Sequence, residues 1–170
     1  ARETDSNQGK LTYAFSVRNQ YMATLGAVDG LAALRNEFLR YQRNFYAKSS
    51  EVASKNKVKG YLINLKKNRT RAQMLVKTLQ RHRVEAYDLK KSITIKGKRF
   101  AKGDAIIIPT NQPQTRFIAG VMEQVTTFED SLFYDVSAWT LPLAFGVDYY
   151  EVKQRPDAFL GARINAINID

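Results

Sequence analysis

The sequence lacks cysteine altogether, and its 170 residues include a single histidine, His82. A cysteine nucleophile is therefore excluded, and a zinc site made from cysteines or several histidines cannot form from these residues alone. A triad of serine, histidine and aspartate would have to use His82. Sixteen aspartates and glutamates leave acid–base chemistry by a pair of carboxylates open. We predict no catalytic residue and no bound metal or cofactor within this chain.

Long apolar runs are missing as well. The most strongly apolar stretch, Ala105 to Pro109, has the length of a strand, whereas a helix that crosses a bilayer needs about 20 apolar residues. We therefore expect no membrane span. The N-terminus does not resemble a signal peptide and begins at Ala1 rather than methionine, so we expect a processed or trimmed chain. An apolar fraction of 44% is enough for a folded core.

Positive charge is concentrated in the middle of the chain, whose net charge is +11. Residues 48–102 carry seventeen basic and three acidic side chains, and residues 103–170 carry four basic and nine acidic ones. This asymmetry is typical of a surface that binds a polyanion, and equally of a face that meets an acidic partner domain. The aromatic residues of the basic region before Phe100, Tyr61 and Tyr87, fall in predicted strands, which argues against stacking on nucleic-acid bases. We favour a solvated or docking face, and an independent module that binds nucleic acid or another polyanion is the alternative.

Apolar periodicity divides the chain into parts. Apolar residues recur at steps of three and four from about Ser16 to Lys48, which predicts one long helix. Residues 49–57 are polar and predict a linker. Residues 58–152 alternate between strand-like and helix-like patterns and predict a separate α/β module. The pattern does not specify a structure for the tail at residues 153–170.

The α/β module is predicted to be a small open parallel sheet flanked by helices, of the flavodoxin-like or class I glutamine amidotransferase-like kind. The predicted strands are Val58–Leu65, Val84–Leu89 and Ala105–Pro109, with a short hairpin around Gly97. The helix between the first two strands has one apolar face, made of Ala72, Leu75, Val76 and Leu79. Because strands that alternate with helices usually form parallel sheets with right-handed crossovers, we expect neighbouring strands to be parallel.

Polar side chains follow two of the predicted strands. In open parallel sheets, ligands bind at the carboxyl ends of the strands. Those ends carry Lys67 and Arg69 after the first strand, and Asn111 and Gln112 after the most apolar one. We take these four residues as a candidate pocket or interface, and Trp139, from an aromatic-rich segment, as a further interface candidate. The competing interpretation is that Asn111 and Gln112 fill a turn and cap the next helix.

The stretch from His82 to Glu85 has the H-x-x-E spacing that zinc carboxypeptidases use for two metal ligands. Such a site needs a third ligand, normally another histidine, and the chain has none. The four residues also fall between a predicted helix and a predicted strand, where Val84 and Ala86 are needed in the core. We interpret His82 as a cation at a helix C-terminus or a surface residue, and the spacing as a coincidence.

Three stretches resemble one protein family. These are GKLTYAFSVRNQYMATLGAVDGLAALRNEFLRYQRNFY at residues 9–46, DAIIIPTNQPQTRFIAGVMEQ at residues 104–124 and FYDVSAWTLPLAFGV at residues 133–147. The last two resemble the C-terminal region of large bacterial zinc carboxypeptidase-like metallopeptidases. In that family, a carboxypeptidase A-type catalytic domain precedes a module that resembles class I glutamine amidotransferases. The first stretch is similar to the end of the catalytic domain and its exit helix.

The resemblance implies that the chain is a non-catalytic C-terminal accessory segment of a secreted or periplasmic zinc carboxypeptidase. Residues 1–48 would be the end of the peptidase domain. That domain would be the partner of this chain, would hold the zinc ion and would cleave peptide substrates near their C-termini. The family's zinc ligands would lie upstream of Ala1, and no catalytic role passes to Glu3. The amidotransferase-like module lacks the cysteine nucleophile that such an enzyme needs.

Overall fold

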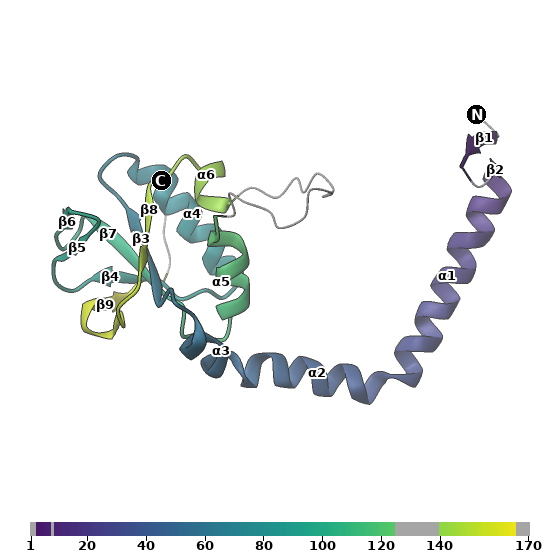
Figure 1. Cartoon of the computed structure of the whole chain (residues 1–170), viewed down its shortest axis with the longest axis horizontal. Coiled ribbons are helices and arrows are strands. Elements are labelled where there is room, and N and C mark those ends of the chain that lie inside the picture. Colours follow the sequence, from purple (N-terminus) through teal and green to yellow (C-terminus); the bar gives the residue numbers. More distant parts are fainter. Residues whose placement is uncertain (1–2, 8, 125–139, 166–170) are drawn as a thin grey trace. The chain divides into compact units, whose positions relative to one another are not determined.

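The computed structural model describes residues 3–7, 9–124 and 140–165, and the chain forms two compact units, residues 1–45 and 46–170 (Figure 1). The N-terminal unit begins with a hairpin of β1 (Glu3–Ser6) and β2 (Gly9–Thr12). Two helices follow, α1 (Tyr13–Ala33) and α2 (Arg35–Ala47). The hydroxyl of Thr12 accepts a hydrogen bond from the Phe15 N–H at 3.2 Å, which caps the N-terminus of α1.

The predicted single helix from Ser16 to Lys48 is two helices in the structure, with Leu34 between them. Backbone hydrogen bonds continue across this position, because the Leu34 N–H donates to the Gly30 carbonyl and the Leu34 carbonyl accepts from the Phe38 N–H. Every residue of both helices is described, and none of them is buried. No helix in the described part of the chain is both long and apolar enough to cross a bilayer.

The C-terminal unit is built around a five-stranded sheet in the order β8-β3-β7-β4-β9, in which all neighbours are antiparallel. Its strands are β3 (Gly60–Asn64), β4 (Tyr87–Leu89), β7 (Ala105–Pro109), β8 (Tyr149–Val152) and β9 (Leu160–Arg163). A separate hairpin consists of β5 (Ile93–Ile95) and β6 (Lys98–Phe100). The described helices are α3 (Ser49–Lys55), α4 (Arg69–Arg81), α5 (Thr115–Met122), α6 (Leu141–Ala144) and the 3-10 helix η1 (Asp157–Phe159).

The prediction of a parallel, flavodoxin-like or amidotransferase-like sheet is wrong. β3 and β4 do run in the same direction, since both pair antiparallel with β7, but β7 lies between them. The cause is the connection from β4 to β7. Residues 90–104 contain the β5–β6 hairpin and no helix, so the chain does not cross a face of the sheet and returns antiparallel to the strand it left. The isoleucines of β7 correctly indicated burial on both faces, but such burial does not fix the direction of a strand.

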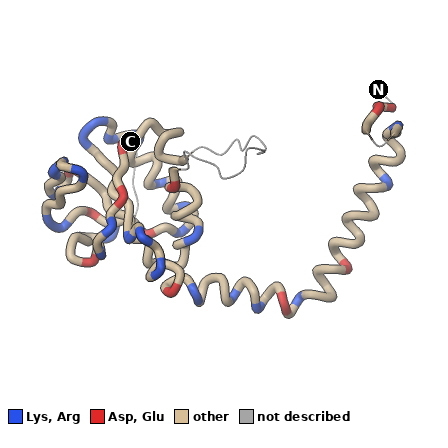
Figure 2. Tube along the Cα trace, in the orientation of Figure 1, with Lys and Arg blue, Asp and Glu red and all other residues tan. Residues whose placement is uncertain are grey.

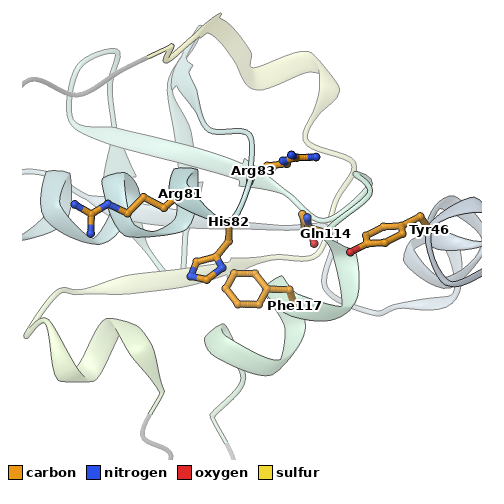
Figure 3. A pocket seen from close by; sticks show the side chains of 6 residues that line it. All are labelled: Tyr46, Arg81, His82, Arg83, Gln114 and Phe117. Atoms are coloured by element: carbon orange, nitrogen blue, oxygen red, sulfur yellow. The ribbon is translucent and has the colours of Figure 1, made fainter. Parts of the chain in front are cut away.

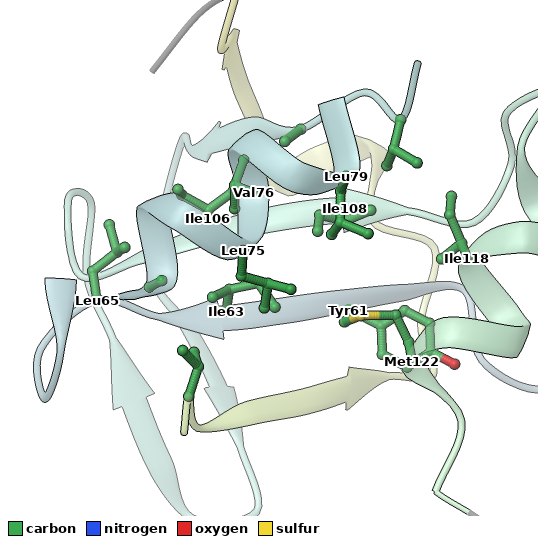
Figure 4. Packing of buried hydrophobic residues seen from close by; sticks show 14 residues of the cluster. Tyr61, Ile63, Leu65, Leu75, Val76, Leu79, Ile106, Ile108, Ile118 and Met122 are labelled. Carbon is green, nitrogen blue, oxygen red and sulfur yellow. The ribbon is translucent and has the colours of Figure 1, made fainter. Parts of the chain in front are cut away.

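Both faces of the sheet are covered by apolar side chains, as the alternation along β3 illustrates. Tyr61 and Ile63 point to the face that α4 and α5 cover, whereas Leu62 points to the face that the β5–β6 hairpin covers. Figure 4 shows the first cluster, whose labelled members include Leu75, Val76, Leu79, Ile106, Ile108, Ile118 and Met122. Full burial of a side chain of this size stabilises a protein by about 1.5–3 kcal/mol. The folded core of the chain therefore lies in the C-terminal unit.

Two segments differ from the predicted division of the chain. Residues 49–57, predicted to be a polar linker, contain α3, in which Ser49 and Ala53 are buried. The hydroxyl of Ser49 donates a hydrogen bond to the Pro113 carbonyl at 2.9 Å, which ties α3 to the segment before α5. The tail, for which the sequence specified no structure, contributes β9 to the edge of the sheet. Polar composition concealed α3 because only two of its residues face inwards.

Candidate functional site

The antiparallel sheet separates the four residues that follow its strands and were taken as a candidate pocket or interface. In the pairing of β3 with β7, the last residue of β3 lies opposite the first residue of β7. Lys67 and Arg69 follow β3, whereas Asn111 and Gln112 follow β7, so the two pairs lie at opposite ends of the sheet. The expectation that these residues share one end of the sheet depended on parallel strands, and the antiparallel pairing places them apart.

Lys66 and Lys67 are exposed, and each lies close to an aspartate. The Nζ of Lys67 lies 3.7 Å from the carboxylate of Asp148, and the Nζ of Lys66 lies 2.8 Å from that of Asp104. The hydrogen bond from Lys66 lowers the pKa of Asp104. Exposed pairs of this kind contribute little to stability. Arg69, the first residue of α4, is also exposed.

Gln112 is a structural residue, and its side chain is 6% exposed. Its Nε2 donates hydrogen bonds to the carbonyls of Pro109 at 2.7 Å and Glu85 at 3.2 Å, and its Oε1 accepts one from the Glu85 N–H at 2.7 Å. These bonds tie the end of β7 to the segment before β4. Asn111 is exposed and lines a cavity instead. Trp139 lies outside the described residues.

A cavity of about 360 Å³ lies beyond the carboxyl end of β7. Its wall combines that end of the sheet with residues of α3 and with the segment that leads into β9. The polar residues of the lining are Ser50, Ser54, Lys59, Glu85, Tyr87, Thr110, Asn111, Arg155 and Asp157. A polar lining with both signs of charge favours the binding of a polar molecule.

Several charged groups in this cavity are already held by the protein. The Oε1 of Glu85 lies 3.1 Å from the guanidinium of Arg163, and its Oε2 accepts a hydrogen bond from the Tyr87 hydroxyl at 2.7 Å. That hydrogen bond raises the pKa of Tyr87. The Nζ of Lys59 donates to two backbone carbonyls at the end of α3, the closer of which is that of Ser54 at 2.8 Å. A carboxylate held by an arginine and a phenol is a poor general base, so this arrangement favours binding over acid–base catalysis.

His82 and Glu85 do not converge on a common point. The imidazole of His82 lies against the ring of Phe117, with the ring centroids 4.6 Å apart. Glu85 is held by Arg163 on the wall of the 360 Å³ cavity. Across residues 3–7, 9–124 and 140–165, no three His, Asp or Glu side chains are grouped so that they could hold a metal ion. The H-x-x-E spacing has no metal-binding geometry here.

A basic hollow of about 290 Å³ lies at the C-terminal end of α4. It is lined by Tyr46, Arg81, His82, Arg83, Gln114 and Phe117. Figure 3 shows the rings of His82 and Phe117 beside each other and the hydroxyl of Tyr46 directed towards Gln114, whereas Arg81 extends away along α4. Sequence reasoning included Arg81 and Arg83 only as members of a basic run. The signal that it missed is an arginine directly after a helix end, where glycine is usual.

Lys and Arg residues also gather around the β5–β6 hairpin, where they are blue in Figure 2. Residues 90–102 carry six cations and no acidic side chain. The two tyrosines of the basic region do not offer a stacking surface, because Tyr61 is 4% exposed and Tyr87 is hydrogen-bonded to Glu85. The basic region is therefore better suited to contact with water than to stacking on nucleic-acid bases.

A large apolar surface lies on α1 and α2. Large apolar side chains that are between 42% and 74% exposed occur along both helices: Tyr13, Phe15, Val17, Tyr21, Met22, Leu25, Val28, Leu31, Leu34, Phe38, Leu39, Tyr41 and Tyr46. On α2, an apolar hollow of about 310 Å³ is lined by Leu34, Glu37, Phe38 and Tyr41. Single exposed apolar residues are ordinary, but this many along two consecutive helices indicate an interaction site.

No family model, curated protein or solved structure matches the chain.

Proposed function

We propose that this chain is a non-catalytic accessory segment at the C-terminal end of a zinc carboxypeptidase-like protein, and that α1 and α2 belong structurally to its peptidase domain and pack against it. One observation carries the proposal: α1 is 21 residues long, has apolar side chains on all of its sides and has no buried residue. A helix that is apolar all round is normally inside a protein. We infer that the peptidase domain covers this helix, because residues 9–46 resemble the end of such a domain.

The exposed surface of α1 is large in energetic terms. Eight large apolar side chains of this helix are substantially exposed, among them Val28 and Leu31 at 57% each. Because full burial of such a side chain stabilises by about 1.5–3 kcal/mol, covering its exposed part would contribute roughly 1 kcal/mol. Eight such residues would together contribute roughly 8 kcal/mol before the entropic cost of docking, which is comparable with the whole stability of a domain.

The accessory role agrees with the chemistry of the C-terminal unit. The one imidazole lies against Phe117, the carboxylate of Glu85 is held by Arg163, and the described residues contain no cluster of three or more His, Asp or Glu side chains. In the proposed protein, the zinc ion of the peptidase domain would polarise the scissile carbonyl and activate water. The C-terminal unit would support that domain or shape access to its cleft. The resemblance also suggests a periplasmic or secreted location.

The test compares one double substitution in two polypeptides, the 170-residue chain and the proposed longer protein. Val28→Glu with Leu31→Glu puts two charges on α1 while retaining good helix formers. In the 170-residue chain both positions are exposed, so we expect the free energy of unfolding to change by no more than about 0.5 kcal/mol. In the proposed longer polypeptide, in which the peptidase domain comes before Ala1, the same change would bury two charges. There we expect a loss of about 3 kcal/mol or more and a loss of zinc-dependent peptide hydrolysis.

Met74→Glu is the matched control, because Met74 is an exposed apolar residue on α4 of the C-terminal unit. We expect it to be neutral in both contexts. Equal stability of the double variant in the short and long polypeptides would contradict docking through α1. Peptide hydrolysis by the longer polypeptide that a chelator does not affect would contradict the zinc peptidase.

A further inference from the structure

The backbone at the end of α4 has an unusual feature. Directly after the cap residue His82, Arg83 adopts a φ of 61°. The Arg83 N–H donates to the Gln80 carbonyl at 2.8 Å, and the N–H of buried Val84 donates to the Leu79 carbonyl at 3.2 Å. This is a helix ending in which glycine normally takes the left-handed position, because a Cβ is unfavourable there. Arg83 therefore occupies a position that glycine would fill at a lower free energy.

The fold does not require a guanidinium at this position. Arg83 is exposed, and no acidic side chain of the described residues forms an ion pair with it. A cation in the last turn of a helix is favourable, but Arg81 already supplies it. The helix dipole thus accounts for Arg81 and does not explain arginine in place of glycine at position 83. Residues in strained backbone conformations are concentrated at functional sites.

The basic hollow beside Arg83 offers the other contacts that a small anion needs. The side chain of Gln114 is partly buried and makes no hydrogen bond with the described residues, so its amide is available. The rings of His82 and Phe117 form an aromatic wall (Figure 3). No carboxylate lines the hollow, so its arginines give it a positive potential. A volume of about 290 Å³ suits a small organic molecule.

We propose that this hollow binds the carboxylate or phosphate group of a small organic anion, with Arg83 and Gln114 as hydrogen-bond donors and Phe117 packed against the organic part. A guanidinium binds both oxyacid groups in the same bidentate geometry, so the two share one chemistry of recognition. Arg81 adds positive charge at the rim. The site does not depend on the proposed role of α1.

The test compares Arg83→Gly with Lys96→Gly in the 170-residue chain. Lys96 is the other non-glycine residue with a positive φ among the described residues, and it lies in the turn between β5 and β6. Each substitution removes one cation and places glycine in a left-handed conformation. We therefore expect neither variant to have a lower Tm than the parent chain. The probes are benzoate, phenyl phosphate and inorganic phosphate at millimolar concentration and low salt, titrated by NMR.

We expect at least one probe to bind the parent chain and the Lys96→Gly variant, and binding to the Arg83→Gly variant to be at least tenfold weaker. Tighter binding of phenyl phosphate than of benzoate would assign phosphate as the ligand group, and the reverse order would assign carboxylate. Equal weakening by both substitutions would indicate general charge attraction and overturn the proposal. Absence of binding by every probe, or a lower Tm for Arg83→Gly, would also overturn it.

Discussion

Gln112 tests how two chain segments beside the 360 Å³ cavity are held together in the C-terminal unit. Its side-chain amide bridges two segments, since it bonds to the carbonyl of Pro109 at the end of β7 and to both backbone groups of Glu85 before β4. Replacing Gln112 by alanine removes all three hydrogen bonds. Gln112 is not among the residues with a positive φ, so its backbone accommodates alanine. The change in the free energy of unfolding therefore measures the loss of these hydrogen bonds.

The expected cost follows from the groups that lose their partners. The hydrogen bond to Pro109 is buried, and those to Glu85 are partly buried, so water replaces them only in part. A buried polar group left without a partner costs about 1–3 kcal/mol. With one buried and two partly buried backbone groups affected, we expect Gln112→Ala to lower the free energy of unfolding by about 3 kcal/mol. For a unit of this size, the Tm would fall by roughly 10 °C.

Urea denaturation followed by circular dichroism measures this loss. The neighbouring substitution Asn111→Ala is the control, because Asn111 is exposed and makes no hydrogen bond with the described residues. We expect Asn111→Ala to change the free energy of unfolding by less than about 0.5 kcal/mol. A loss below about 1 kcal/mol for Gln112→Ala, or equal losses for the two variants, would refute the bridging role.

Two further predictions concern the sheet and its core. A Cβ added at Gly161 in β9 would lie 2.8 Å from the backbone oxygen of Asp88, so we expect Gly161→Ala to lower the free energy of unfolding by about 1–3 kcal/mol. Gly120→Ala in α5 meets no atom within 4 Å and should instead stabilise by about 0.5–1 kcal/mol, and thermal denaturation of both variants checks the pair. Burial raises the pKa of Tyr61 to about 12, so the folded state retains this proton more tightly than the unfolded chain, in which tyrosine titrates near 10. The stability that Tyr61 contributes is complete below about pH 10 and is lost as the pH rises towards 12. Between these values the urea midpoint of Tyr61→Phe should therefore fall less steeply with pH than that of the parent chain. Parallel curves for the two proteins would contradict this.

The buried faces of individual elements were predictable from the sequence. Helix α4 was predicted to bury Ala72, Leu75, Val76 and Leu79, and all four are buried. The strand at residues 105–109 and the hairpin around Gly97 are also confirmed. These features depend on the period of side chains along one element, which local sequence determines.

The direction of the strands was not predictable from the same pattern. The consecutive apolar residues of β3 and β7 fit either strand direction, and the connection through the β5–β6 hairpin makes the pairing of β4 with β7 antiparallel. The candidate site at residues 67, 69, 111 and 112 assumed parallel strands, so the error in strand direction also affected the predicted site. The partner of Gln112, Glu85, lies 27 positions away, so its bridging role required the folded structure. The hollow at Arg83 also depends on tertiary contact with Phe117.

The central claim is that α1 is covered by a peptidase domain in the intact protein. Amide hydrogen exchange of residues 13–33 tests it most directly, because a buried helix exchanges only when its cover opens. It is measured in the 170-residue chain and in the proposed longer polypeptide, in which a peptidase domain comes before Ala1. We expect exchange along α1 to be fast in the short chain and at least a hundredfold slower in the longer one, while β7 exchanges at the same rate in both. Equally fast exchange of α1 in the two polypeptides would contradict the claim.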